Sequence, residues 1–235
     1  QVLLCRSPFS MGSVFAAPTE QGNGTGGLSP RRPGGKKLLI AVSGKRASGK
    51  DYLSTLILEE GARQVEGVLR KRLAFADQCK HEFAAREGLE VEKMLHDREY
   101  KEKYRAKMTD FYLETVASDP AHFISSVVED AVRFFAQSGE APALCVVSDL
   151  RHRTEVPYLR SVEMRELTDA IILTRVVADD ETRRQRGWVP DGEKDSSSTE
   201  CDLDTFQTFE WVLENHDANL VLQQVQQKVL SWYQT

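Results

Sequence analysis

Cysteine is scarce in this sequence, and its cysteines show no pairing pattern. They form no C-x-x-C or cysteine–histidine grouping, which excludes a disulfide framework or a zinc site and favours a reducing compartment. The sequence also lacks any run of about 18 consecutive apolar residues, the length that a membrane-spanning helix needs. Integral membrane proteins are therefore excluded.

Positive charge is also in short supply outside the first segment of the chain. The formal net charge is −5 at pH 7, yet residues 1–37 carry five basic side chains against one acidic side chain. The remaining residues are therefore more acidic than the whole. An acidic body repels a phosphate backbone, so we expect no nucleic-acid partner. A small anion can still bind where basic side chains gather.

Glycine and proline are concentrated at the beginning of the chain. Seven of the 15 glycines and four of the eight prolines fall within the first 37 residues. Such a segment cannot bury enough apolar surface to offset the entropy lost on ordering. We expect residues 1–36 to form a disordered N-terminal tail and residues 37–235 to form one folded domain.

The domain alternates short apolar runs with segments of helical periodicity, which predicts β-α-β units around a parallel sheet. The predicted strands are 38–43, 68–73, 144–148, 170–177 and 211–214. The predicted helices are 50–62, 77–87, 100–117, 121–137, 152–163 and 218–233. These elements predict a three-layer α/β/α fold with a five-stranded parallel sheet. The polar stretch 189–205 interrupts the pattern, and we expect a mobile lid over about 183–203.

One motif in the sequence points to a specific chemistry. The pattern G-x-x-x-x-G-K directly follows the first predicted strand and directly precedes a predicted helix, which is the context of a phosphate-binding P-loop. Its glycines let backbone N–H groups approach phosphate oxygens, and its lysine reaches the β- and γ-phosphates. The residues of the motif are Gly44, Lys45, Arg46, Ala47, Ser48, Gly49, Lys50 and Asp51.

The motif departs from the usual pattern at its last position. Asp51 stands where a serine or threonine hydroxyl commonly binds Mg²⁺. Its carboxylate either contacts the metal or caps the following helix, and the sequence leaves both alternatives open. Asp149 follows the third predicted strand, at the end where α/β sheets place ligands, and is a second candidate for Mg²⁺.

Arginines gather in two groups after Asp149. Arg151 and Arg153 follow it directly, and the cluster Arg175, Arg183, Arg184 and Arg186 precedes the polar stretch 189–205. Phosphoryl transfer needs cations that close over the transferred group. We therefore expect at least two of these arginines to act on phosphates, and we expect repulsion among residues 183, 184 and 186 to keep the empty lid open.

Together with the P-loop, four further segments resemble the animal-type phosphomevalonate kinases over residues 37–233. They are Val-Ser-Asp-Leu-Arg at 147–151, Arg-Arg-Gln-Arg-Gly-Trp at 183–188, Thr-Glu-Cys-Asp-Leu-Asp at 199–204 and Trp-Val-Leu-Glu-Asn-His at 211–216. That family has a P-loop fold similar to the nucleoside-monophosphate kinases. An aspartate after the P-loop lysine is characteristic of the family.

The resemblance implies transfer of the γ-phosphoryl group of ATP to (R)-5-phosphomevalonate, with Mg²⁺, in the mevalonate route to isoprenoids. It implies catalytic roles for Lys50, Arg151, Arg175, Arg183 and Arg186. It implies that residues 44–51, Arg186 and His216 bind the nucleotide. It also implies that substrate is bound by Lys80, Arg105, Arg151 and Asn215. The metal candidates remain Asp51 and Asp149, from their positions in the sequence.

The sequence differs from the family pattern at three basic positions, since Ala47, Val116 and His152 stand where lysine or arginine is common. A C-terminal peroxisomal tripeptide is absent, and we expect a monomer in the cytosol. Two rival hypotheses remain. The first is a kinase of the same fold with a different small acceptor. The second is a module that binds ATP without turnover.

Overall fold

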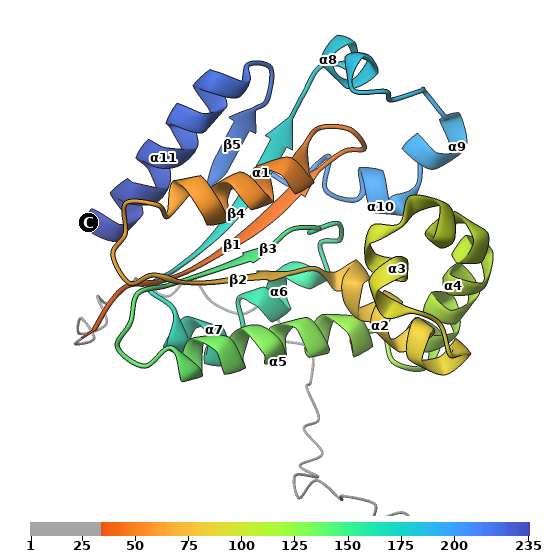
Figure 1. Cartoon of the computed structure of the whole chain (residues 1–235), viewed down its shortest axis with the longest axis horizontal. Helices are drawn as coiled ribbons and strands as arrows, with labels where there is room; N and C mark the ends of the chain where they lie inside the picture. The colour runs from red at the N-terminus through yellow and green to blue at the C-terminus, as the bar shows by residue number, and fades with distance from the viewer. Residues whose placement is uncertain (1–33) are drawn as a thin grey trace, which may run out of the picture. The chain divides into compact units, whose positions relative to one another are not determined.

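The chain folds around a five-stranded parallel sheet in the strand order β2-β3-β1-β4-β5 (Figure 1). We describe residues 34–235 of a computed structural model, without the side chain of Arg98. The strands are β1 (Lys37–Gly44), β2 (Leu69–Leu73), β3 (Ala143–Val147), β4 (Ala170–Val177) and β5 (Trp211–Glu214). All five predicted strands are confirmed to within one residue at each end. Because β1 and β3 are buried on both faces, they appear in the sequence as continuous apolar runs.

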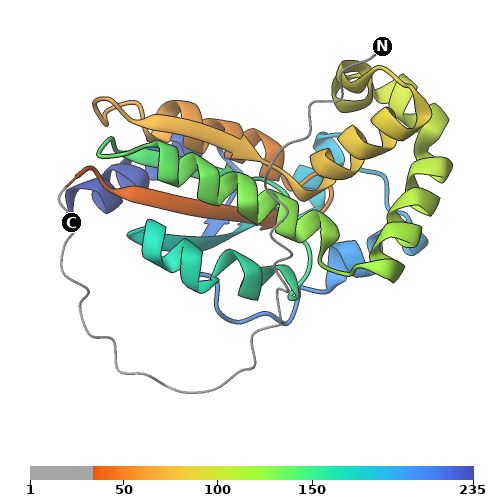
Figure 2. The same ribbon diagram turned by 90° about the horizontal axis from the view of Figure 1, so that it is seen from below.

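Helices cover both faces of the sheet, which confirms the three-layer fold (Figures 1 and 2). On one face, Leu38 and Ile40 pack against α1 (Lys50–Leu56), the π-helix η1 (Ile57–Gly61) and α11 (Ala218–Gln234). On the other face, Leu39 and Ala41 pack against α5 (His122–Gln137), α6 (Glu155–Leu159) and α7 (Val162–Leu167). Alternate residues of β1 therefore enter two separate cores, as the period of a strand requires.

Three further helices form a group beyond the carboxyl end of β2. They are α2 (Phe75–Glu87), α3 (Val91–His96) and α4 (Arg98–Ser118), and they enclose a core of Phe83, Ala84 and Met94. The sequence predicted α2 and α4 but missed α3, which has only six residues. This group matters for the site because α2 and α4 carry predicted substrate-binding cations.

Two other helical segments differ from their predictions. The predicted helix 50–62 continues through η1, and the predicted helix 152–163 is two helices, α6 and α7. The break has a local cause, because the Ser161 side chain accepts a hydrogen bond from the backbone of Met164 and begins a new helix.

The predicted tail 1–36 lies mostly outside the described residues. Its last residues are attached to the domain, since the Gly35 N–H donates to the Glu140 carbonyl at 2.6 Å and Lys36 Nζ donates to the Trp232 carbonyl at 3.2 Å. A Cβ at Gly35 would lie 2.3 Å from the nitrogen of Pro142. Gly35 and Lys36 therefore contact the folded domain, and glycine allows the close backbone approach at position 35.

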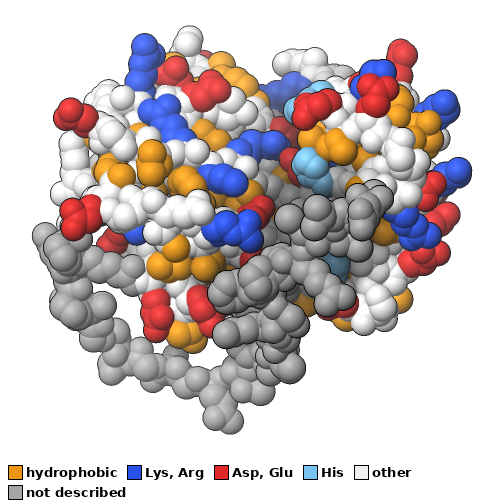
Figure 3. Space-filling model, turned by 60° about the horizontal axis from the view of Figure 1, so that its bottom comes forward, with side chains coloured by type: hydrophobic (Ala, Val, Ile, Leu, Met, Phe, Trp, Pro, Cys, Tyr) orange, Lys and Arg blue, Asp and Glu red, His pale blue; other side chains and the backbone are white. Residues whose placement is uncertain are grey.

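The described surface carries charge of both signs. On the face drawn in Figure 3, basic and acidic side chains are interspersed. Within residues 34–235, no helix is both long and apolar enough to cross a bilayer.

Candidate active site

The P-loop connects the end of β1 to the start of α1, at the carboxyl edge of the sheet. Its backbone adopts left-handed conformations at Ala47 (φ 57°) and at Gly49 (φ 90°). A Cβ at Gly49 would lie 2.2 Å from the amide nitrogen of Asn215, so only glycine fits there. The loop is therefore bent tightly and pressed against the segment that follows β5.

The N-terminus of α1 fits a phosphate group. Within the described residues, no side chain caps this helix. The N–H groups of its first turn have no partner within the helix, and the helix dipole favours an anion at this end. Lys50 begins the helix with a side chain only 13% exposed, and its Nζ lies 3.3 Å from Asp51 Oδ2.

Asp51 makes no capping hydrogen bond in this structure, so the capping alternative for Asp51 has no support. Its side chain is 68% exposed, in the first turn of α1 beside Lys50. Among residues 34–235, no group of three or more histidine, cysteine or acidic side chains is arranged to hold a metal. Mg²⁺ commonly uses one or two carboxylates together with substrate phosphates, so a single exposed carboxylate here fits that ion.

Arg183, Arg186 and Asn215 fix the P-loop from the side of β5. Arg183 Nε donates to the Arg46 carbonyl at 2.9 Å. Arg186 Nη1 and Asn215 Nδ2 both donate to the Ser48 carbonyl, at 3.0 and 2.8 Å. Arg186 Nη2 also reaches the Asn215 carbonyl at 2.7 Å. The three side chains therefore stabilise the bent conformation of the loop.

These contacts revise two expectations. Arg183 does not simply repel its neighbours, because it pairs with Asp180 at 2.9 Å and stacks 3.7 Å from the centre of the Trp188 ring. Asn215, expected to bind substrate, is 3% exposed and donates to the loop backbone. The contact of Asn215 joins residues far apart in the chain, whereas Asp180 and Trp188 lie within five residues of Arg183.

Four cations around the P-loop pair with acidic residues of the polar stretch 189–205. Lys45 and Arg175 contact Asp204 at 2.7 and 2.8 Å. The guanidinium groups of Arg46 and Arg151 contact acidic side chains at 3.0 Å each, and their partners are Asp195 and Glu200 respectively. The predicted site residues on β1, β3, β4 and the lid are thus brought together at one edge of the sheet.

The lid segment is attached at more points than its polar sequence suggests. It contains the short helices α8 (Asp180–Gln185), α9 (Gly192–Asp195) and α10 (Ser198–Cys201). The flanking Trp188 is 9% exposed and Leu203 is 2% exposed. The expectation of an open lid considered the arginines and not the carboxylates of the segment, which find basic partners only in the folded chain. Motion of the lid stays a prediction.

Two buried carboxyl groups lie beneath the loop that carries Arg151. Asp149 accepts hydrogen bonds from the backbone N–H groups of Phe75 (2.7 Å) and Ala76 (2.9 Å), and so holds the start of α2. Glu155 Oε2 accepts from the N–H groups of Arg151 (2.7 Å) and His152 (2.9 Å). Burial raises the pKa of both carboxyl groups, and that of Glu155 rises to about 8.

The Glu155→Gln variant is expected to gain stability relative to the wild type as the pH rises. The pKa of Glu155 is 4.5 when unfolded and about 8 when folded, so its contribution to stability is full below pH 4.5 and is lost by about pH 8. Glutamine keeps the single acceptor oxygen that Arg151 and His152 use. Denaturant unfolding at pH 5 and pH 8 measures the difference in stability between the variant and the wild type. Glu166→Gln, at an exposed position of α7, is the control. An equal difference at both pH values contradicts the prediction.

The helices α2 and α4 carry the cations Lys80, Lys101 and Arg105. Lys80 Nζ contacts Asp77 at 2.6 Å, and Arg105 pairs with Glu102 on the surface of α4. Lys101, which the sequence analysis did not select, has a lowered pKa because of burial first and then the charges of Lys80 and Arg105. The charges of Asp77 and Asp51 oppose this shift in the pKa of Lys101, so Lys101 lies within electrostatic range of the P-loop aspartate. Their helical spacing, Lys101 and Arg105 being four residues apart, was a usable signal.

His216 lies beside α8 and not in a metal cluster of the described residues. Its Nδ1 is 3.5 Å from Asp179 and 3.4 Å from the Thr182 hydroxyl. The ring is 40% exposed, so it remains accessible to a ligand.

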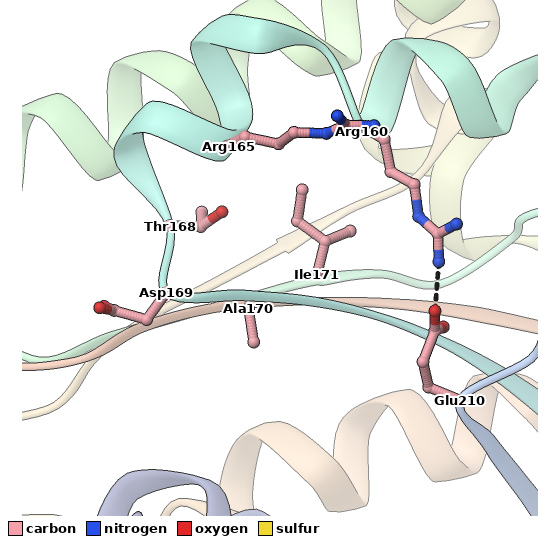
Figure 4. Close-up of a pocket in the computed structure, with 7 residues that line it drawn as sticks. All are labelled: Arg160, Arg165, Thr168, Asp169, Ala170, Ile171 and Glu210. Carbon is pink, nitrogen blue, oxygen red and sulfur yellow. Dashed lines mark hydrogen bonds and ion pairs between the residues drawn. The ribbon is translucent and has the colours of Figure 1, made fainter. Parts of the chain in front are cut away.

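A pocket of about 420 Å³ lies away from the P-loop (Figure 4). It is at the amino end of β4, whereas the residues described above follow the carboxyl ends of the strands. In this pocket, Arg160 pairs with one carboxylate oxygen of Glu210. The other oxygen accepts a hydrogen bond from the Leu173 N–H at 2.8 Å, one residue before the pairing of β4 with β5 begins. This pocket is therefore separate from the candidate active site.

The parallel sheet, the P-loop and the surrounding arginines define a P-loop kinase. The family model described as phosphomevalonate kinase matches residues 42–165. The phosphomevalonate kinase of Drosophila melanogaster is 31% identical over 181 residues, which are 76% of this chain and 88% of that protein. The chain therefore belongs to the phosphomevalonate kinase family, and ATP is the phosphoryl donor that this family implies.

Solved kinase structures are also similar to the chain. The APS kinase of Mycobacterium tuberculosis has a TM-score of 0.45 and 13% identity, covering 87% of this chain and all of that one. The shikimate kinase of Acinetobacter baumannii has a TM-score of 0.37 and 12% identity, covering 83% of this chain and 91% of that one.

Proposed function

We propose that this protein transfers the γ-phosphoryl group of ATP to (R)-5-phosphomevalonate, giving ADP and 5-diphosphomevalonate. The observation that carries the proposal is the convergence of Lys50, Arg151 and Arg175 with an uncapped helix N-terminus at one edge of the sheet. This edge offers positive charge for two polyanions. Membership of the phosphomevalonate kinase family supports the identity of the acceptor.

The proposed roles follow from position. The backbone of residues 44–51 and Lys50 bind the ATP phosphates, while Arg186 and His216 lie on the nucleotide side next to β5. We assign the acceptor to Lys80, Lys101 and Arg105 on α2 and α4, together with Arg151 after β3. Asn215 contributes indirectly by supporting the P-loop. Arg175 and Arg183 contribute through the loops that they contact.

Mg²⁺ fits this site through Asp51, whose carboxylate is exposed beside the phosphate-binding lysine. The ion would neutralise phosphate charge during transfer. Asp149 would act on it only through water, because both its carboxylate oxygens already accept backbone N–H groups.

The acceptor needs no general base. The second pKa of a phosphate monoester is about 6, so at pH 7 the attacking oxygen is already largely deprotonated. A bond forms from this oxygen to the γ-phosphorus, the bond to ADP breaks, and no proton has to move. Unit like charges about 4 Å apart repel by about 4 kcal/mol at an effective dielectric constant of 20. The main task of the cations is therefore to bring two polyanions together in line.

A coupled ADP-release assay tests this function. With ATP and Mg²⁺, we expect phosphomevalonate to raise ADP release on the order of 10²-fold or more over the rate without acceptor, because water is excluded from the closed site. Mevalonate, which lacks the phosphate, and a panel of nucleoside monophosphates are the controls. Turnover of a nucleoside monophosphate would favour the rival kinase. Tight ATP binding without any turnover would favour a binding module.

We further propose that the enzyme acts as a monomer in the cytosol, without a nucleic-acid or membrane partner. The acidic body of the domain supports the absence of a nucleic-acid partner.

A further inference from the structure

Glu200 of α10 connects two parts of the site, the P-loop and the loop that carries Arg151. Its side chain is only 6% exposed. Oε1 accepts a hydrogen bond from Arg151 Nη1 at 3.0 Å, and Oε2 accepts one from the backbone N–H of Arg46 at 2.7 Å. One buried carboxylate from the lid therefore bridges the P-loop and the arginine that follows β3.

Neighbouring contacts hold the same two segments together. Arg151 Nη1 also donates to the Thr199 carbonyl at 3.3 Å. The Arg153 backbone N–H donates to Asp202 at 2.8 Å, and Arg153 Nε donates to the Asp202 carbonyl at 2.8 Å. Residues 199–202 thus run along residues 151–153. The Glu200 bridge belongs to an extended contact and is not an isolated surface pair.

The chemistry of the bridge requires a carboxylate. Each oxygen of Glu200 faces a different N–H donor, and a carboxylate can accept on both oxygens. An amide has one acceptor oxygen and one donor nitrogen. Glutamine at this position would satisfy one donor and present its own N–H groups to the other, whichever way it turned. At a buried site, an unpaired donor is costly.

We propose that Glu200 is a positioning residue that fixes Arg151 relative to the P-loop, and so sets the acceptor phosphate against the ATP phosphates. The inference rests on the proposed function. Arg151 has five N–H donors, and the contact through Nη1 leaves others for the acceptor. Glu200 therefore orients the guanidinium without occupying all of it.

The alternative role for Glu200 is to compete with the acceptor for Arg151, and it predicts the opposite change in KM. If the carboxylate only competed with the acceptor for Arg151, removing its charge would strengthen acceptor binding and lower KM. If it positions Arg151, removing its charge breaks one of the two contacts and raises KM for the acceptor. The direction of the change distinguishes the two roles.

The test compares Glu200→Gln with Glu193→Gln, the same change at an exposed lid position in α9. We expect Glu200→Gln to raise KM for phosphomevalonate and to lower kcat/KM for it about tenfold or more, because small misplacement of reacting groups has large effects. KM for ATP should change less than twofold. Glu193→Gln should behave as the wild type. An unchanged or lowered acceptor KM in Glu200→Gln overturns the proposal.

A double-mutant cycle asks whether the effect passes through Arg151. In an Arg151→Met background, Glu200→Gln should no longer change KM for the acceptor, because the group that it positions is absent. Independent, additive effects contradict the proposal. Thermal unfolding of each variant checks folding. If Glu200→Gln does not fold, Glu200→Asp replaces it, since the shorter stem cannot reach both donors, and full activity of that variant overturns the proposal.

The wild-type assay separates this inference from the proposed function. If the wild type does not turn over phosphomevalonate, the proposed function fails before any variant is compared. If the wild type is active and the two glutamine variants are equal, only the role of Glu200 fails.

Discussion

The Lys50→Ala variant is expected to lose at least about 10³-fold in kcat while keeping the fold. Lys50 is the lysine of the G-x-x-x-x-G-K motif and stands at the uncapped start of α1. A cation directed at the β- and γ-phosphates stabilises charge that shifts toward the leaving ADP in the transition state. Its removal should therefore affect kcat more than KM for ATP.

Stability should change little, because within residues 34–235 the Lys50 ammonium group pairs with the exposed carboxylate of Asp51. Steady-state ADP release measures kcat, and thermal unfolding verifies the fold. Lys228→Ala, at an exposed position of α11, is the matched control and should keep wild-type kcat. A Lys50→Ala enzyme that retained more than a tenth of wild-type kcat would remove Lys50 from the catalytic group.

The sheet and the P-loop were predictable because both depend on local sequence. Buried parallel strands are continuous apolar runs, and the P-loop needs glycine at positions such as Gly49, where any Cβ would collide with Asn215. The break between α6 and α7 was harder to predict from the sequence, because it depends on one capping residue, Ser161. Short helices such as α3 contain too few residues to show a period.

The partners of the site arginines were not predictable from the sequence. Lys45, Arg46 and Arg175 lie more than 25 residues before the acidic residues that they contact. A polar stretch with alternating charges looks like a solvated loop until its carboxylates are placed against the P-loop. The charge pattern therefore indicated where cations gather but not that the lid itself supplies their counter-ions.

These counter-ions change how lid closure must work. In this structure, carboxylates of the lid segment partly neutralise the cations to which we assign phosphate binding. Phosphates carry more charge than a carboxylate and are expected to strengthen the closed arrangement by adding partners for Lys50 and Arg186. The exposed part of the lid, α9 with its four residues, has few buried apolar contacts and should open most easily.

Arg186→Ala is expected to lower kcat about 10²-fold and to abolish ligand-dependent protection of the lid. Arg186 joins the Ser48 carbonyl of the P-loop to the Asn215 carbonyl after β5, and its backbone begins the turn into the lid. Without the guanidinium, Asn215 still donates to Ser48, so the loop keeps one support. The phosphates lose the cation that links them to the lid.

Amide exchange of residues 189–203 measures this coupling directly. In the wild type, exchange should be fast without ligands and slower with an ATP analogue and phosphomevalonate together. Arg184→Ala is the control, because Arg184 is an exposed arginine two residues before Arg186. Its guanidinium group lies 5.8 Å from the centre of the Trp188 ring. It should keep both kcat and protection. Equal exchange with and without ligands in the wild type would mean that the segment is a fixed loop. If Arg186→Ala lost kcat but kept ligand-dependent protection, Arg186 would act on the phosphates and not on the lid.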